Sequence, residues 1–305
     1  MQIKKVSIIG LGALGILYGN HFSKRIPKED LRIIADQERI DRYKRDQVFC
    51  NRERCDFDYV TPEEHCEPAD LLIFTVKYDG LKSAIEAVKN HVGEKTIILS
   101  ALNGISSEEI IGERYGMDKV LFTVAQGMDA VKVGNHLTCA SMGLLCIGER
   151  EEGIISENVK RVAAFFDKTE FPYEIETNMM KRQWGKFMAN VGVNQAVAVY
   201  GGSFGDTQKA GEVRETMIAA MKEVIALSKE VGINLTEADL TYWITILDKL
   251  NPEGKPSMAQ DVEAKRYSEV ELFSGTVLRL GEKYGVSTPV NKALYERIKA
   301  IESEY

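Results

Sequence analysis

The sequence predicts an α/β N-terminal domain with a mostly parallel sheet, followed by an all-α C-terminal domain. Short apolar runs alternate with helical patterns in the first half, a glycine-rich turn follows the first run, and the second half is helical almost throughout. The chain has 305 residues, enough for two domains that each bury a core. We place the boundary just after the Phe171-Pro172 break, which gives domains of residues 1–175 and 176–305.

The first domain is built from short apolar runs that turns separate. We expect helices at 14–23 and 81–90, and strands at 5–9, 31–35, 69–76, 96–100 and 120–125. Continuous apolar runs are typical of strands in a parallel sheet that helices cover on both faces. Residues 137–140 and 143–147 are expected to be later strands that form an antiparallel edge.

The second domain shows helical spacing of its apolar residues. Residues 213–228 repeat apolar positions at this spacing, and a capping signal precedes a helix that runs through Leu250. Ser257 is expected to start one long helix that Gly285 ends. Pro289 is expected in the first turn of the last helix, where its fixed φ angle fits.

The composition narrows the classes of partner. The formal net charge of −7 argues against binding nucleic acid or an anionic membrane, and leaves a small-molecule substrate open. No run approaches the ~18 apolar residues of a membrane helix, and no secretory signal is visible, so we expect a cytoplasmic protein. The cysteines, even with His65, fit no common zinc spacing. We therefore expect no metal, and reduced thiols at Cys50, Cys55, Cys66, Cys139 and Cys146.

A glycine-rich turn stands between the first strand and the first helix, where a Rossmann-type dinucleotide fingerprint stands. Gly10 permits the tight turn, Gly12 lets the backbone approach a pyrophosphate, and Gly15 lets the helix pack closely on the strand. The helix N-terminus then faces the phosphates. The expected cofactor contacts are the six residues Gly10, Leu11, Gly12, Ala13, Leu14 and Gly15.

The end of the second strand chooses between NADH and NADPH in such domains. Asp36 stands there, and its carboxylate accepts a hydrogen bond from a free ribose 2′-hydroxyl but repels a 2′-phosphate, which favours NADH. Arg39 and Arg42 follow closely and can hold a 2′-phosphate if Asp36 turns away. They can equally be solvated charges on a helix, and the sequence leaves both interpretations open.

Residues 184–194 carry three polar side chains on a largely apolar helix. Lys186, Asn190 and Asn194 are spaced i, i+4 and i+8, which places them along one stripe. Polar side chains on a buried helix need partners, so the stripe predicts a substrate site, with a solvent-facing stripe as the alternative. A lysine there can protonate a carbonyl oxygen as hydride reaches its carbon.

Four further residues are candidates for the same site. Lys77 and Asn103 each follow the carboxyl end of a strand, where ligands collect in open parallel sheets. Ser257 and Glu269 are expected on the long late helix. For each of them alone, a structural role is as reasonable as a functional one.

Five motifs in this order resemble those of the ketopantoate reductase (2-dehydropantoate 2-reductase) family, over nearly the whole chain. They are the turn at 10–15, Thr75-Val76-Lys77, Asn103-Gly104, the 184–194 helix, and Ser257-Met258-Ala259-Gln260-Asp261 with Glu269 eight residues beyond. The resemblance implies a Rossmann-like domain, a helical domain and an active site between them. It also implies reduction of 2-dehydropantoate to (R)-pantoate by NADPH, a step of pantothenate biosynthesis.

The resemblance assigns a role to each matched residue. Lys186 is the general acid of the reaction. The implied substrate contacts are Asn103, Asn190, Asn194 and Ser257, of which Asn103 also contacts the cofactor. Lys77, Ala130 and Glu269 complete the implied cofactor site, and Glu269 also lies at the hydroxyl end of the substrate. The apolar late helices allow a homodimer.

Two departures from the family keep alternatives open. Many members have a basic residue where Asp36 stands, which opposes the usual preference for NADPH. Ser203-Phe204 replaces a further substrate-binding Asn ahead of the glycine that matches Gly205, so a reductase of another branched 2-oxo acid is a second hypothesis. A dinucleotide-binding sensor without turnover is the third, and the presence of Lys186 beside Asn190 argues against it.

Overall fold

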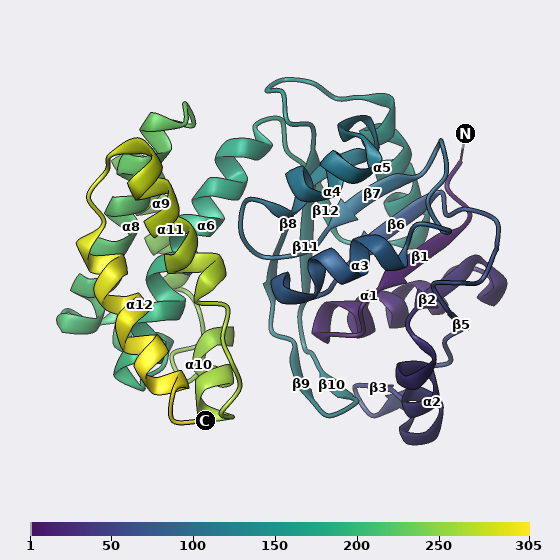
Figure 1. The fold of residues 1–305 in the computed structure, drawn as a ribbon, viewed down its shortest axis with the longest axis horizontal. Helices are drawn as coiled ribbons and strands as arrows, with labels where there is room; N and C mark the ends of the chain where they lie inside the picture. Colours follow the sequence, from purple (N-terminus) through teal and green to yellow (C-terminus); the bar gives the residue numbers. More distant parts are fainter. Residues whose placement is uncertain (1) are drawn as a thin grey trace. The chain divides into compact units, whose positions relative to one another are not determined.

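The α/β and all-helical parts predicted from the sequence are both present in the structure, a computed structural model that describes residues 2–305. One unit ends at Met180 and the other runs from Lys181 to Tyr305 (Figure 1). The first is built on a mostly parallel sheet and the second on helices, which confirms the predicted fold class. None of the described helices is long and apolar enough to cross a membrane.

An eight-stranded sheet forms the centre of the first unit. In spatial order its strands are β12 (Tyr173–Ile175), β11 (Met142–Gly148), β8 (Val120–Met128), β7 (Ile97–Ser100), β6 (Leu71–Phe74), β1 (Val6–Ile9), β2 (Leu31–Ile34) and β5 (Tyr59–Val60). Neighbouring strands are parallel except for β11 and β8, which are antiparallel. The short apolar runs of the sequence therefore form the parallel sheet that they predict.

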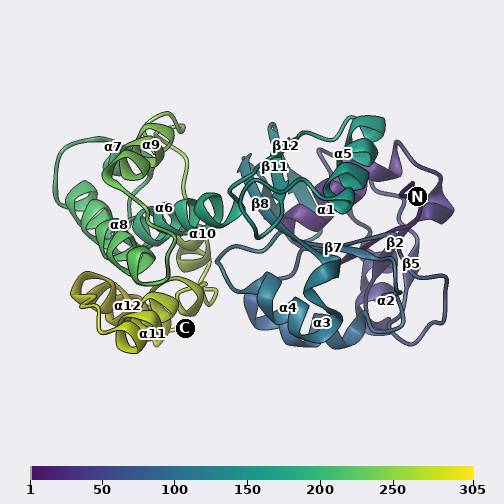
Figure 2. The ribbon, with the colours of Figure 1, turned by 90° about the horizontal axis from the view of Figure 1, so that it is seen from above.

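Helices cover both faces of this sheet, as Figure 2 shows. The helices and 3₁₀ turns of the first unit are α1 (Ala13–Ser23), η1 (Lys28–Asp30), α2 (Gln37–Asp46), η2 (Tyr78–Gly80), α3 (Leu81–Ala87), α4 (Ser107–Tyr115), η3 (Met117–Lys119) and α5 (Glu157–Thr169). Alternate strand residues point to opposite faces. Ile8 and Ile73 share a core with α1 and α5, whereas Ile9 and Phe74 share another with α3 and α4.

The predicted antiparallel edge is right for one strand and wrong for the other. Residues 143–147 lie in β11, antiparallel to β8. Residues 137–140 leave the main sheet, because β10 (His136–Thr138) pairs with β9 (Val131–Val133) and β3 (Phe49–Cys50) in a small sheet that β4 (Glu53–Arg54) completes. Asn51 fixes this pairing, since its side chain donates to and accepts from the backbone of Cys139 at 2.8 Å each.

The second unit is helical. Its elements are α6 (Met179–Tyr200, which begins in the first unit), α7 (Phe204–Gln208), α8 (Glu212–Glu230), α9 (Glu237–Leu247), α10 (Ser257–Glu263), the π-helical turn η4 (Glu271–Gly275), α11 (Thr276–Tyr284) and α12 (Pro289–Glu302). Helix α8 contacts α7, α11 and α12. Gly285 ends α11 with a φ of +70°, and Pro289 stands in the first turn of α12, as the sequence predicts.

The single long helix predicted over residues 257–285 is wrong. Helix α10 stops after two turns, because Lys265 adopts a φ of +50°, in the left-handed region that ends helices. The Arg266 side chain folds back onto the Asp261 carboxylate at 2.8 Å and holds the break. Glu269 therefore lies in the connection before η4 and not on a helix shared with residue 257.

Candidate functional site

The glycine turn joins β1 to α1 where the order of the strands reverses. Strand β1 lies between β2 and β6, so the chain proceeds to opposite sides of it, and such switch points open a crevice at the carboxyl ends of the strands. Ile9 pairs with Phe74, and Phe74 pairs with Ser100. The loops that carry Gly10, Lys77 and Asn103 therefore start at one edge of the sheet.

The turn itself has the shape of a phosphate cradle. Gly10 has a φ of +95°, and a Cβ atom there would lie 2.7 Å from Val76 Cγ1. A Cβ atom at Gly15 would collide with the Gly10 carbonyl oxygen. Gly12 begins α1 without any side-chain cap, and no acidic residue stands in the first turn of that helix. Its first N–H groups thus suit an anion, and the cradle fits a dinucleotide pyrophosphate.

Thr75 is a positioning residue that the sequence analysis missed. Its buried hydroxyl lies 2.6 Å from the Gly10 carbonyl oxygen and 3.1 Å from that of Ile9. It therefore ties the end of β6 to the turn that follows β1. The only signal in the sequence is a hydroxyl-bearing residue at the end of an apolar run, where strand propensity alone explains a threonine.

The other predicted cofactor residues of the first unit lie in loops at or near the sheet edge. Leu11 is buried in the core, and Ala13 and Leu14 are half-buried and pack against it. Lys77 is exposed and precedes η2, Asn103 is half-buried before Gly104, and Ala130 is half-buried between β8 and β9.

Asp36 forms the N-terminal cap of α2. Its carboxylate accepts a hydrogen bond from the backbone N–H of Arg39 at 2.8 Å and another from Nη1 of the same residue at 2.9 Å. The carboxylate is thus fixed just beyond β2, and it holds Arg39. The Arg42 guanidinium lies 5.5 Å from the centre of the Tyr43 ring.

Three predicted substrate residues of the second unit form a hydrogen-bonded chain. The Ser257 hydroxyl donates to Asn194 Oδ1 at 3.2 Å, and the Asn194 amide donates to Asn190 Oδ1 at 3.4 Å. The backbone N–H of Met258 also donates to Asn194 Oδ1, at 3.2 Å. Because Asn194 is only 4% exposed, a solvent-facing stripe is excluded at that position. Lys186 lies one turn before Asn190 and is half-buried.

Helix α6 is fixed on its other side by α9. Gly185 lacks a Cβ atom, which would collide with the Trp243 indole. Lys181 pairs with Asp239 at 3.1 Å, and Arg182 donates to the Tyr242 hydroxyl at 3.0 Å. These contacts hold the first two turns of α6 against α9.

The remaining predicted residues of the second unit lie on loops and short helices. Ser257 is the first residue of α10 and does not cap it, because Pro256 takes that position. Glu269 is half-buried, and its backbone carbonyl accepts from Leu272 N at 3.0 Å. The Phe204 ring packs on Gly254, in the loop that leads to Ser257, so Phe204 supports this loop.

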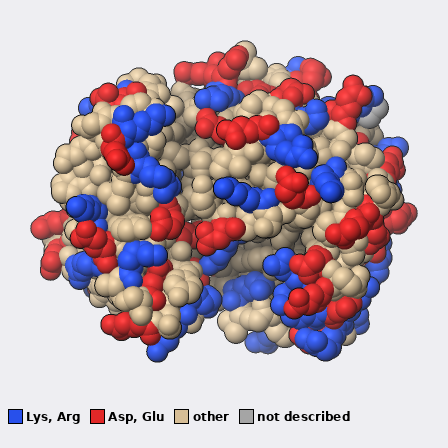
Figure 3. Space-filling view, in the orientation of Figure 1, with Lys and Arg blue, Asp and Glu red and all other residues tan. Residues whose placement is uncertain are grey.

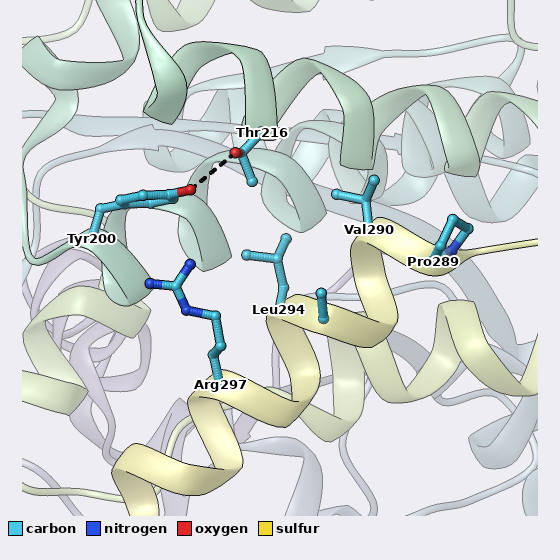
Figure 4. Close-up of a pocket in the computed structure, with 7 residues that line it drawn as sticks. Tyr200, Thr216, Pro289, Val290, Leu294 and Arg297 are labelled. Atoms are coloured by element: carbon cyan, nitrogen blue, oxygen red, sulfur yellow. Dashed lines mark hydrogen bonds between the residues drawn. The ribbon is translucent and has the colours of Figure 1, made fainter.

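A hollow of about 300 Å³ lies elsewhere in the second unit, along α12 (Figure 4). Figure 4 shows Arg297 beside the ring of Tyr200, whose centre lies 4.9 Å from the guanidinium. Its other lining residues are Thr216, Pro289, Val290, Ala293 and Leu294. None of the predicted site residues lines this hollow.

Charged side chains and cysteine thiols are the other groups that could form a site. Figure 3 shows acidic and basic side chains interspersed on the face drawn. All five cysteines are free thiols. Within residues 2–305, no group of three or more His, Cys, Asp and Glu side chains is placed to hold a metal ion.

A dinucleotide cradle at a switch point, in a chain that also carries the polar stripe on α6, defines an oxidoreductase that uses a nicotinamide dinucleotide. Family models place it more narrowly. "Ketopantoate reductase PanE/ApbA" matches residues 6–152, and "Ketopantoate reductase PanE/ApbA C terminal" matches residues 178–302. The chain belongs to the ketopantoate reductase family.

Individual relatives match along the full length. The 2-dehydropantoate 2-reductase of Aquifex aeolicus is 28% identical over 99% of this chain and 98% of its own, and that of Archaeoglobus fulgidus is 25% identical over 99% of both. Among solved structures, D-mandelate dehydrogenase with NADH and anilino(oxo)acetate gives a TM-score of 0.86 at 20% identity, over 98% of this chain and 99% of that one. The ketopantoate reductase of Ralstonia eutropha gives 0.83 at 22% identity, with the same coverage. These structures share the fold.

Proposed function

We propose that this chain is a 2-dehydropantoate 2-reductase, which reduces the ketone of 2-dehydropantoate to (R)-pantoate in pantothenate biosynthesis. The observation that carries the proposal is the stripe of Lys186 and Asn190 with Asn194, which is hydrogen-bonded to Ser257. The full-length similarity to named 2-dehydropantoate 2-reductases supports it. A non-catalytic sensor has no need of a proton donor at this position.

The residues of α6 supply what a ketone reduction needs beyond hydride. The glycine turn, Lys77, Asn103, Ala130 and Glu269 would hold a reduced nicotinamide dinucleotide, which would supply the hydride for the ketone carbon. Negative charge then develops on the ketone oxygen, and the Lys186 ammonium donates the proton that completes the alcohol.

The Asn190–Asn194–Ser257 chain orients the substrate beside this proton donor. Ser257 and Met258 both donate to Asn194, so the Asn194 carboxamide is held in one orientation. Asn194 in turn occupies the Asn190 oxygen, which leaves the Asn190 amide nitrogen as a donor for the substrate carboxylate.

The cofactor is NADH in preference to NADPH. The family resemblance implies NADPH, whereas the Asp36 carboxylate, fixed as a helix cap, opposes a 2′-phosphate and suits a 2′-hydroxyl. Its ion pair with Arg39 also engages a cation that could otherwise hold such a phosphate.

Steady-state assays of the purified protein test the substrate assignment. We expect 2-dehydropantoate to give the highest kcat/KM among branched 2-oxo acids, each assayed with NADH and with NADPH. The alternative is a reductase of another branched 2-oxo acid, which Phe204 favours because it stands where the family has a substrate-binding Asn. A higher kcat/KM for such an acid than for 2-dehydropantoate would establish this alternative. Cofactor binding without turnover of any substrate would establish a sensor.

The oligomeric state can be proposed from a structural neighbour. A Staphylococcus aureus ketopantoate reductase with a TM-score of 0.75 is described as dimeric. We infer that this chain also forms a homodimer, and sedimentation equilibrium that gives the mass of one chain would contradict this.

A further inference from the structure

Gln183 lies on the same side of α6 as the predicted substrate residues. An α-helix turns by about 100° per residue, so Gln183 is about 20° from Asn190 and from Asn194, and about 60° from Lys186. The opposite side of the helix, around Gly185, packs against α9. The polar stripe therefore begins one turn before Lys186, with an amide side chain that the sequence analysis did not single out.

The amide oxygen of Gln183 is buried without a partner. The residue is 3% exposed, and within residues 2–305 its Oε1 atom accepts no hydrogen bond. A buried carbonyl without a partner is destabilising, because it has lost its hydrogen bonds to water and gained none in return. Gln195, on the same helix, is a buried glutamine whose amide group has partners on both atoms. Its Nε2 donates to the Val191 carbonyl at 2.7 Å and to Asn291 Oδ1 at 3.1 Å, and its oxygen accepts from the Ser274 hydroxyl. The hydrogen bonds within the core therefore account for a glutamine at position 195. Among the described residues, no such bond accounts for the amide oxygen of Gln183.

The order of groups along the stripe matches the order of groups in one substrate. Gln183 offers an acceptor, Lys186 a proton donor, and Asn190 an amide donor. In 2-dehydropantoate the hydroxyl, the ketone oxygen and the carboxylate follow one another in this order. The carboxylate and the ketone oxygen only accept hydrogen bonds, so the hydroxyl is the one group of this substrate that can donate to Gln183.

We propose that Gln183 is a further substrate-binding residue, whose amide oxygen accepts a hydrogen bond from the hydroxyl of a 4-hydroxy-2-oxo acid. The proposal rests on the proposed reductase function and adds the feature that selects hydroxylated 2-oxo acids over those without the hydroxyl.

The test compares two substrates that differ by one oxygen atom: 2-dehydropantoate and 3,3-dimethyl-2-oxobutanoate, which has the same skeleton without the hydroxyl. The variant is Gln183→Met, similar in size but without an acceptor. We expect Gln183→Met to lower kcat/KM for 2-dehydropantoate by about 10- to 100-fold and for the deoxy compound by less than about 3-fold. Its Tm should be unchanged or higher, because an orphaned buried oxygen is removed.

Gln195→Met is the matched control. It should lower the Tm and leave the ratio of the two kcat/KM values unchanged, because Gln195 serves only the core. An equal loss on both substrates in Gln183→Met, or a fall in Tm without a change in the ratio, would overturn the role of Gln183. If the wild-type protein reduced neither substrate, the reductase function would fail first and the role of Gln183 with it.

Discussion

Replacing Asp36 by Asn removes the charge that opposes NADPH while preserving the local fold. Asparagine caps helices as well as aspartate does, so the bond to the Arg39 backbone N–H, 2.8 Å long in the wild type, should persist. The ion pair with Arg39 Nη1, at 2.9 Å, should not. The variant thus ends the repulsion of a 2′-phosphate and releases a guanidinium that can bind one.

The expected change in cofactor preference follows from how exposed the Asp36–Arg39 ion pair is to solvent. Two unit charges 4 Å apart interact by about 1 kcal/mol in water and about 4 kcal/mol at an effective dielectric constant of 20. The side chains of Asp36 and Arg39 are 49% and 61% exposed, which places the effect toward the lower end. A combined change of about 2–3 kcal/mol corresponds to a shift of about 30- to 150-fold in the NADPH/NADH preference.

The assay is kcat/KM for each cofactor at saturating 2-oxo acid, with the Kd of each cofactor from fluorescence titration. The wild type should prefer NADH, and Asp36→Asn should gain NADPH activity. The double variant Asp36→Asn/Arg39→Ala is the control, and it should lose most of that gain because the released cation is absent. A wild type that prefers NADPH, or an unchanged ratio in Asp36→Asn, would refute the reasoning.

Three further predictions concern single side chains. Lys186→Met should lower kcat by about 10²- to 10⁴-fold in steady-state assays while the cofactor Kd stays constant, and an unchanged kcat would remove the lysine from the mechanism. Thr75→Val removes the hydroxyl 2.6 Å from the Gly10 carbonyl and should weaken cofactor binding about 5-fold in titrations; equal affinity would mean that the turn holds itself. Burial lowers the pKa of His91 below 6.5, so the unfolded chain binds the proton first and the free energy of unfolding should fall as pH drops through 6.5. Urea titrations at several pH values should show a weaker fall in His91→Gln, and an identical fall would assign the effect to other groups.

The sequence predicts those features of the fold that depend on neighbouring residues along the chain. The apolar runs predict the strands around β1, because burial on both faces requires continuous apolar residues. The glycine turn is predictable because Gly10 and Gly15 have no room for a Cβ atom. Helical spacing places Asn190 and Asn194 on one stripe, and the structure adds that they are hydrogen-bonded.

Contacts between distant segments are not encoded in such patterns. The hydrogen bond from Ser257 to Asn194 joins residues 63 apart in the sequence, and only family resemblance suggests it. The break after α10 could not be predicted from glycine or proline, since neither occurs there. Lys265 itself adopts the left-handed conformation that ends the helix. Strand β10 joins a small sheet through Asn51, a pairing that its own residues do not reveal.

The most direct test of the account is the identity of the product. The purified protein should convert 2-dehydropantoate and NADH to (R)-pantoate and NAD⁺ in a one-to-one ratio, which chiral chromatography and the absorbance of the reduced nicotinamide measure together. We expect one enantiomer with a matching loss of NADH from the wild type, and almost no pantoate from Lys186→Met. A wild-type protein that binds NADH but forms no pantoate would contradict it.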